Sequence, residues 1–547
     1  MMRMKHISLS VVGKLCCGLA AVFSFIACND DWNDHYEPAT TVGGTLWHAI
    51  STNQALSNFA QVAQACGYDR ILDGSQTFTV FAPSNSAFSA SEAEALISSY
   101  QQQEAAGVRP NDNTVVKRFL QNHIAQYRYP VSSLTNRTII LMNDKYAMLT
   151  SSQLNGHTLS TKNTHCDNGL LFTLDTPVTY EPNVLECLDI EDGLDSVYHF
   201  LCSHNVYEFN ELQSVPGEII DGVTHYLDSV TVLTNDLLSS YGLINSEDST
   251  YWFVAPTNTE WNRLVAEYTP YFNYADNVGD RDSMLYTNTR LGIIGGGFFS
   301  RTNNPDIAFN DSAVSTQAMS AQIRQQLGIS DSYYIYQRPF DEGGVFYGAI
   351  DIPCSNGHVL KAENHHISKF ETFMQTIMVE AENNIYQDTL INAVTPMTIT
   401  QVTSNNEFYN QVSGGAYVEV IPTNPSARVA VGFKVPNLLS GIKYDIYAVF
   451  APATAADPLA VDEASKPFRV LSRIRQPNQD GVINEPPFRY AKSVDGTKVD
   501  EVLLQSGVRL TTCSWGLSTP TVRLELQSNT DGATLRIDRI IFRPVEQ

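Results

Sequence analysis

One twelve-residue block occurs twice in this chain and constrains its fold more than any other feature. Residues 77–88 read TFTVFAPSNSAF, and residues 250–261 read TYWFVAPTNTEW. In each copy an alternating apolar run, typical of a strand, ends at a proline, Pro83 or Pro256, because proline cannot continue a strand interior. The repeat therefore predicts two copies of one strand-to-helix corner.

The residues after each proline are helix-capping types. Ser84 or Asn85 is expected to cap the helix that follows the first copy, and Thr257 and Asn258 occupy the same place in the second. FLQNHIAQYRYP follows the first block and carries Asn122 and His123. The corresponding stretch of the second copy, DSMLYTNTRLGIIGGGFFS, has no histidine, and its three glycines indicate a bend or a close backbone contact.

Each copy also closes on the same short hairpin signal. Asn168-Gly169 and Asn356-Gly357 each follow a cysteine two residues before the asparagine. Asn-Gly favours a tight turn because both residues tolerate positive φ. Three motifs in order thus mark the first copy, and two of them, the corner and the hairpin, recur in the second.

Together these motifs resemble the fasciclin (FAS1) domain, whose hallmark is an apolar strand running into F-A-P-T/S-N-x-A-F. The resemblance implies α+β FAS1 domains, each a β-sandwich or barrel wedge with helices, in tandem at residues 45–190 and, in divergent form, 191–373. FAS1 domains are mostly adhesive. The matching positions are expected to organise the fold, with His123 a hydrogen-bonded core residue: Pro83, Asn85, His123, Pro256 and Asn258.

Residues 374–547 change to short β-rich runs separated by Pro, Gly and Asn turns, which predicts a sandwich. VEAEN, the G-x-x-Y-x-I-Y run and LRIDRIIF resemble a galactose-binding-type carbohydrate-binding module, which implies an all-β jelly roll. In such modules the strand that matches VEAEN often supplies a calcium ligand, so Glu380 and Glu382 are weak candidates for a structural calcium. No other cofactor is expected.

Exposed aromatic side chains are the signal for sugar binding, because a flat ring stacks on the apolar face of a pyranose. The candidates in this region are Trp515, which is the first choice, Tyr490, Tyr409 and Phe488. Each could equally fill the interior of the sandwich. The ligand would be a polysaccharide or a glycoprotein glycan.

Motifs for catalysis are missing from the sequence, including HExxH, a P-loop, a dinucleotide G-x-G-x-x-G and a nucleophile elbow. The vicinal His365-His366 pair is interpreted as solvent-facing in a linker. No enzyme is predicted, and a glycoside hydrolase, which needs two carboxylates about 5–10 Å apart, is the less favoured alternative.

The first 27 residues have the pattern of a cleaved export signal, and FSFIAC resembles the lipobox of bacterial lipoproteins. The resemblance implies lipid attachment at Cys28, an acidic tether over residues 28–44, and display on the outer membrane surface, as in Bacteroidota lipoproteins. A net charge of −24 argues against nucleic acid as a partner. Six cysteines remain once the two in the export signal and Cys28 are set aside. Their spacing does not match a metal-binding motif, so buried thiols are expected for most of them.

Two functions fit these features. The first is a non-catalytic adhesion or glycan-binding accessory of a polysaccharide uptake system, since divergent FAS1 lipoproteins occur beside bacterial glycan-uptake systems. The second is a structural component that contacts SusC/SusD-like proteins or another cell.

Overall fold

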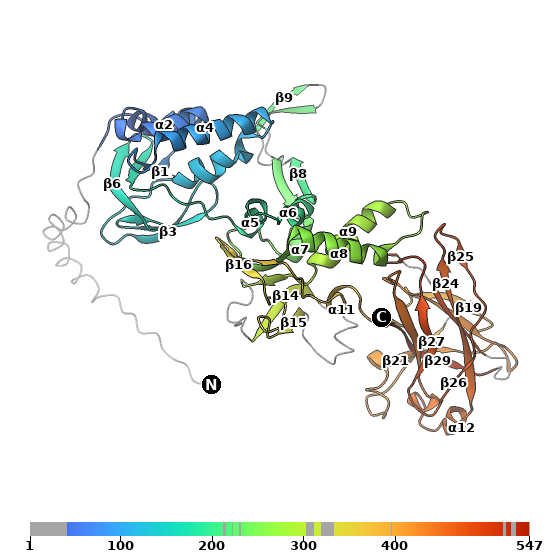
Figure 1. Cartoon of the computed structure of the whole chain (residues 1–547). Coiled ribbons are helices and arrows are strands. Elements are labelled where there is room, and N and C mark those ends of the chain that lie inside the picture. The colour runs from blue at the N-terminus through green and yellow to red at the C-terminus, as the bar shows by residue number, and fades with distance from the viewer. Residues whose placement is uncertain are drawn as a thin grey trace, which may run out of the picture. The chain divides into compact units, whose positions relative to one another are not determined.

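The computed structural model of the chain (Figure 1) describes residues 41–545 except 210, 212–214, 221–222, 229–230, 302–310, 319–332, 395–396, 518–520 and 527–531. The export signal and Cys28 predicted from the sequence lie outside these residues. Among the described helices, none is both long and apolar enough to cross a membrane. The chain divides into two compact units, Met1–Pro182 and Asn183–Gln547.

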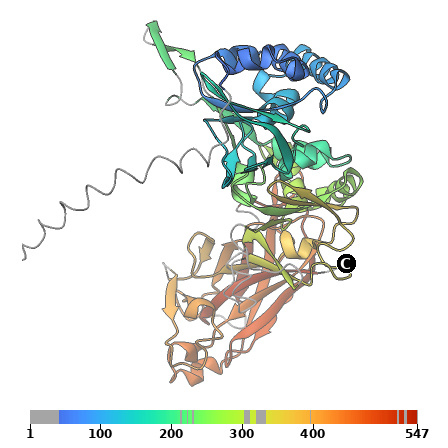
Figure 2. The same cartoon turned by 90° about the vertical axis from the view of Figure 1, so that its left-hand side faces the viewer.

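The first unit is built on a seven-stranded sheet in the order β2-β1-β7-β6-β5-β4-β3. The repeated block supplies β1, which runs parallel to β7 and antiparallel to β2. Figures 1 and 2 show helices α2 and α4 gathered along one side of this unit. The strands are β1 (Phe78–Pro83), β2 (Ile124–Gln126), β3 (Asn136–Ile140), β4 (Tyr146–Thr150), β5 (Gln153–Leu154), β6 (His157–Cys166) and β7 (Gly169–Leu174), and the helices are α1 (Leu46–Ser51), α2 (Ser57–Ala65), α3 (Tyr68–Asp73) and α4 (Ala90–Ala105).

The second unit begins with a copy of the same topology. Its repeated block supplies β12, which runs parallel to β17 and antiparallel to β13, in a sheet ordered β15-β14-β13-β12-β17-β16. The strands are β12 (Tyr251–Pro256), β13 (Phe298–Ser300), β14 (Ser312–Ala318), β15 (Tyr333–Gln337), β16 (Ile350–Cys354) and β17 (Gly357–Ala362), and the helices include α5 (Val184–Ile190), α6 (Asp195–Cys202), α7 (Asp236–Tyr241), α8 (Asn258–Tyr268), α9 (Arg281–Ile294) and α11 (Lys369–Thr372). Between α6 and α7 stand two strand pairs, β8 (Asn205–Phe209) with β11 (Thr231–Asn235) and β9 (Val215–Ile220) with β10 (Val223–Asp228).

The corner after β1 differs from the prediction. Neither Ser84 nor Asn85 caps the next helix; Ser89 does, in a capping box with Glu92. The Asn85 side chain instead accepts a hydrogen bond from the backbone of Asn58 (3.1 Å), in the first turn of α2. Asn85 is therefore a link between the corner and an earlier helix.

The second copy keeps this link. Asn258 accepts a hydrogen bond from the backbone N–H of Ser196 (3.0 Å), in the first turn of α6. Here Thr257, and not Asn258, is the helix cap, since its hydroxyl accepts from the backbone N–H of Glu260. Both strands end at their prolines, as the repeat predicts.

The boundary between the two copies, predicted at residue 190, lies earlier in the division of the chain into compact units. Helix α5 belongs with the second copy, because the backbone N–H of Val184 donates to the side chain of Asn356 (2.8 Å) in the hairpin that precedes β17. The division falls between Pro182 and Asn183. A second predicted boundary, at residue 373, falls inside a single compact unit.

Residues 377–545 form two antiparallel sheets whose inner faces share a core of Val, Leu, Ile, Phe and Tyr side chains. The first sheet holds β20 (Thr398–Gln401), β21 (Ala416–Val420), β29 (Leu535–Val545), β23 (Lys443–Phe450) and β27 (Asp500–Arg509), with β18 (Ile377–Glu380) beside β29. The second holds β19 (Gln387–Ile391), β22 (Ala430–Lys434), β28 (Thr521–Leu526), β24 (Phe468–Pro477) and β25 (Ile483–Asn484), with β26 (Lys492–Val494) beside β24. This is the sandwich that the sequence predicts.

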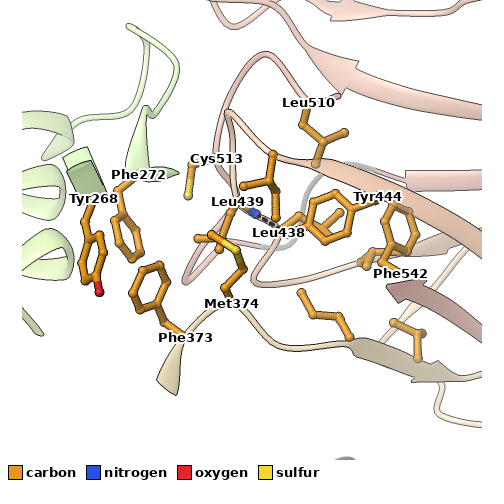
Figure 3. Packing of buried hydrophobic residues seen from close by; sticks show 14 of the residues in the cluster. Tyr268, Phe272, Phe373, Met374, Leu438, Leu439, Tyr444, Leu510, Cys513 and Phe542 are labelled. Atoms are coloured by element: carbon orange, nitrogen blue, oxygen red, sulfur yellow. Dashed lines mark hydrogen bonds between the residues drawn. The ribbon is translucent and has the colours of Figure 1, made fainter. Parts of the chain in front are cut away.

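The second copy and the sandwich share one hydrophobic core. Phe272, at the end of a 3-10 helix (Thr269–Phe272), packs on Phe373 with ring centroids 5.3 Å apart. Figure 3 shows this aromatic group meeting Met374 and the sandwich residues Leu438 and Leu439. Buried apolar contacts of this kind hold the two parts together as one body.

Candidate functional site

The four aromatic residues predicted to bind sugar lie in different surroundings. Trp515 is half-buried and packs edge-on against Phe272 of the second copy, with ring centroids 5.8 Å apart. Tyr409 is 40% exposed, and Tyr490 is 91% exposed. Phe488 lies two residues before Tyr490 and under the guanidinium group of Arg473. Only Phe488 and Tyr490 share a segment.

Trp515 lines a hollow of about 380 Å³ between the second copy and the sandwich. That volume falls within the range of small-ligand sites, about 300–1,000 Å³. The wall combines aromatic rings with amide and hydroxyl side chains: Tyr334, Phe373, Tyr386, Trp515, Gln317, Gln375, Asn437, Thr372 and Thr376. Rings for stacking and uncharged polar groups for hydroxyls are the two elements that a sugar site requires.

Hydrogen bonds to the second copy fix the position of Trp515. Its carbonyl accepts from the hydroxyl of Tyr274 (3.1 Å), which is fully buried, and the Tyr274 hydroxyl accepts from the Asn288 side chain (3.0 Å). The backbone N–H of Cys513 donates to the carbonyl of Asn273 (2.7 Å). The loop that carries Trp515 is thus held by residues about 240 positions away in sequence, so its surroundings were not predictable from local patterns.

The polar groups at the hollow are uncharged. Burial raises the pKa of Tyr334 to about 12, so its hydroxyl remains a neutral donor at physiological pH. The Gln317 side-chain oxygen is buried without a hydrogen-bond donor. An unsatisfied buried acceptor costs about 1–3 kcal/mol.

Of the three histidines singled out in the sequence, His123 is part of the core of the first unit. His123 is buried, its Nδ1 lies 2.7 Å from the Phe119 carbonyl, and its Nε2 accepts from the backbone N–H of Val178 (2.9 Å). Burial lowers its pKa to about 4. These contacts agree with the core role expected for His123.

His365 contradicts the prediction that it faces solvent in a linker. The residue is half-buried with its Nδ1 atom fully buried, burial lowers its pKa to about 4, and its backbone N–H donates to Glu260 (3.0 Å). Glu260 is also paired with Arg263 at 2.7 Å. The second copy therefore has a half-buried histidine of its own, taken from the segment after β17.

Glu380 and Glu382, the weak calcium candidates, lie near a third acid, Asp538 of β29. Glu380 accepts a hydrogen bond from the hydroxyl of Ser413 (2.7 Å), and Asp538 accepts one from the backbone N–H of Ser413 (3.1 Å). Burial and the mutual repulsion of the three acids raise the pKa of Glu382 to about 7 and that of Asp538 to about 8, although Arg539, 2.6 Å from Asp538, acts in the opposite direction.

Oxygens of Glu380 and Glu382 are buried without a partner, which is the kind of group that a cation would satisfy. Within the described part of the chain, however, no three His, Cys, Asp or Glu side chains are grouped so as to hold a metal ion. Without a bound cation, the raised pKa values of Glu380, Glu382 and Asp538 favour their protonated forms. Calcium stays a prediction from the sequence.

Within the described residues, no disulfide joins any of the six cysteines. Four are buried, as expected for most of them, and burial raises the pKa of Cys66 and of Cys513 to about 12. Cys202 and Cys354 are half-buried.

Comparison with known proteins identifies the first unit. Residues 54–180 match the Fasciclin domain family, so the chain contains a fasciclin (FAS1) domain there. No curated protein matches the chain.

Three solved structures resemble parts of the chain. A FAS1 domain pair from the insect cell adhesion molecule fasciclin I is 12% identical, covers 58% of this chain and 98% of its own, and has a TM-score of 0.20. The CBM22-1 xylan-binding domain of Paenibacillus barcinonensis Xyn10C is 12% identical over 32% of this chain and 95% of its own, with a TM-score of 0.21. The family 11 carbohydrate-binding module from Clostridium thermocellum is 11% identical over 31% of this chain and 98% of its own, with a TM-score of 0.18. None of these likenesses carries an argument about what this chain binds.

Proposed function

We propose that this protein is a non-catalytic glycan-binding protein of the cell surface. The hollow around Trp515 is the observation that carries the proposal, because it joins stacking rings to uncharged hydrogen-bonding groups. The ligand would be a segment of an uncharged polysaccharide or of a glycoprotein glycan. The fasciclin domain at residues 54–180, of a class that is mostly adhesive, fits a binding role.

Attachment to the outer membrane through a lipid on Cys28 is part of the proposal. It is supported by the lipobox-like FSFIAC sequence and by the acidic residues that follow it. The protein would hold glycans near a SusC/SusD-like uptake system. Detection of a lipid-modified Cys28 by mass spectrometry of the mature protein tests this part separately.

Affinity electrophoresis and calorimetry against a panel of uncharged polysaccharides test the binding role. Trp515→Ala should lower affinity about tenfold or more, because stacking on an aromatic ring is lost together with the wall of the hollow. Tyr334→Phe removes only a hydroxyl and should lower affinity a few-fold, since one ligand hydrogen bond contributes about 0.5–1.5 kcal/mol.

Tyr409→Ala is the matched control. It removes a partly exposed aromatic ring from the same sandwich but not from the hollow, so affinity should be unchanged. Circular dichroism should show that all three variants are folded. If no polysaccharide binds the native chain, or if only Tyr409→Ala reduces binding, the proposed site is wrong.

A second candidate function is contact with another protein. The β8–β11 ladder exposes apolar side chains on both of its faces, with Val206 54% and Val232 38% exposed on one face and Leu233 46% exposed on the other. Such a surface is typical of protein contacts. Co-purification of a detergent-solubilised complex that is lost on changing Val206 and Leu233 to serine would favour this function over glycan binding.

A further inference from the structure

The outward face of the second sandwich sheet carries a line of arginines. Arg473 of β24 lies directly opposite Arg523 of β28, which lies opposite Gly432 of β22, and Gly432 lies opposite Thr389 of β19. Arg475 follows on the same face of β24, because strand residues two apart point the same way. We call Arg473, Arg475 and Arg523 the arginine row.

Two carboxylates, those of Glu485 and Asp388, pair with guanidinium groups of the arginine row. Arg475 lies 2.7 Å from Glu485 and 3.7 Å from Asp388, and Arg473 lies 3.5 Å from Glu485. Like charges directly opposite each other destabilise a sheet. Burial, together with the guanidinium groups of Arg473 and Arg475, lowers the pKa of Arg523. The row therefore keeps a surplus positive charge in a chain whose net charge is −24.

The row also has donors left over. Arg523 donates to the hydroxyl of Thr389 (3.3 Å), but the Nε groups of Arg473 and Arg523 are buried without an acceptor. A guanidinium group carries five N–H donors in a planar fork that matches carboxylate and sulfate oxygens. An anion bound to the outer N–H groups of the row would balance the positive charge that Glu485 and Asp388 leave.

An aromatic segment runs beside the row. The Phe488 ring centroid lies 4.3 Å from the guanidinium carbon of Arg473, and the backbone N–H of Arg489 donates to the Ser472 carbonyl of β24 (2.8 Å). Tyr490 follows and is 91% exposed. An open ring next to cations suits a sugar that bears an acidic group, because the ring can stack while the arginines bind the acid.

We propose that the arginine row, with Tyr490 beside it, binds the carboxylate or sulfate groups of an acidic polysaccharide. The inference rests on the proposed glycan-binding function and names a ligand class for a second surface of the same sandwich. Uncharged sugar units would still bind in the Trp515 hollow.

Binding of the full, unlipidated chain (Cys28→Ser) to matched polymers tests the proposal. Polygalacturonate is compared with its methyl ester, and dextran sulfate with dextran, so that each pair differs only in charge. The charged polymers should bind in low salt and release as salt rises. Arg523→Gln should lower their affinity about tenfold, since a charge-assisted hydrogen bond is lost.

The same variant separates binding from structure. Arg523→Gln removes a like charge opposite Arg473, so its unfolding midpoint should be equal to or above that of the native chain while its affinity falls. Arg428→Gln is the matched control, because it removes one positive charge near the same sheet but outside the row, where Arg428 lies 3.8 Å from Glu525. Its affinity should change less than about twofold.

Each other outcome overturns the inference in a recognisable way. If only the uncharged polymers bind, the row is not a ligand site although glycan binding stands; if no polymer binds, both proposals fall. Equal losses in Arg523→Gln and Arg428→Gln would mean unspecific attraction. Lower stability with unchanged affinity in Arg523→Gln would mean a structural role, and binding only to phosphatidylglycerol vesicles would mean a lipid surface. Preference for polygalacturonate or for dextran sulfate identifies the acid as carboxylate or sulfate.

Discussion

Asp538 shows how burial decides the chemistry of a single residue in the sandwich. Its side chain is fully buried on β29, next to Glu380 and Glu382, and its pKa is raised to about 8. An ordinary aspartate loses its proton near pH 4. Between about pH 4 and pH 8, Asp538 therefore keeps a proton in the folded chain that it has lost in the unfolded chain.

Stability of the sandwich should fall as the pH rises from about 5 to about 8.5. Because Asp538 and Glu382 have raised pKa values in the folded state, they contribute fully at low pH and lose that contribution as they ionise. Calorimetry should show a fall of at least about 1 kcal/mol over this range. Asp538→Asn should flatten the dependence, since an amide does not ionise.

Asp495→Asn is the control for this prediction. Hydrogen bonds from Thr497 lower the pKa of Asp495, so it is ionised throughout the range and its replacement should leave the alkaline decline unchanged. If millimolar calcium chloride raised the unfolding midpoint at pH 8 in the native chain but not in Glu382→Gln, the acids would bind the cation that the sequence resemblance implies.

At the scale of the element, the Asn-Gly hairpin has a larger role than a turn. Asn168 accepts from the backbone of Leu46 (2.7 Å) and donates to the carbonyls of Leu72 (2.8 Å) and Gly74 (2.7 Å). Its counterpart Asn356 makes the same three kinds of bond, to Val184, Ile244 and Ser246. Each asparagine thus ties the first helix of its copy to the sheet.

The reason given for these hairpins from the sequence was wrong in the first copy. Neither Asn168 nor Gly169 has positive φ, whereas Gly357 does, at +145°. Glycine is needed at both places because a side chain would collide with the neighbouring parallel strand: a Cβ on Gly169 would lie 2.1 Å from the Phe78 carbonyl oxygen, and one on Gly357 would lie 1.8 Å from that of Tyr251. Close backbone approach is a tertiary effect, which a dipeptide cannot reveal.

Replacing either asparagine should therefore be costly. Asn168→Ala and Asn356→Ala each remove three hydrogen bonds to the backbone, two of them buried, so we expect a loss of about 3 kcal/mol in the free energy of unfolding, measured with urea. Asn53→Ala removes an exposed cap, the 3.0 Å bond to the backbone of Ala55, and should cost about 1 kcal/mol or less. Equal costs for Asn53→Ala and Asn168→Ala would show that the hairpin is not an anchor.

At the scale of the whole molecule, local patterns predicted elements better than their assembly. The strand ends at Pro83 and Pro256 and the β-rich third region follow from sequence alone, because propensity and alternation are local. The surroundings of Trp515 depend on Tyr274, far away in sequence, and could not be predicted. Two members of the arginine row did leave a signal: Arg473 and Arg475 stand two residues apart on one strand, which places them on one face.

The shared core predicts that the second copy and the sandwich open together. Phe272 is 1% exposed and packs on both Phe373 and Trp515, so Phe272→Ala should destabilise the second unit by about 3–5 kcal/mol. Hydrogen exchange read by mass spectrometry should then rise in β12 and in β29 alike. Phe59→Ala is the matched control, because Phe59 is fully buried in a separate core of the first unit and should raise exchange there. Faster exchange confined to β12 would mean that the sandwich is stable by itself, and that the Trp515 hollow lies between two parts able to move apart.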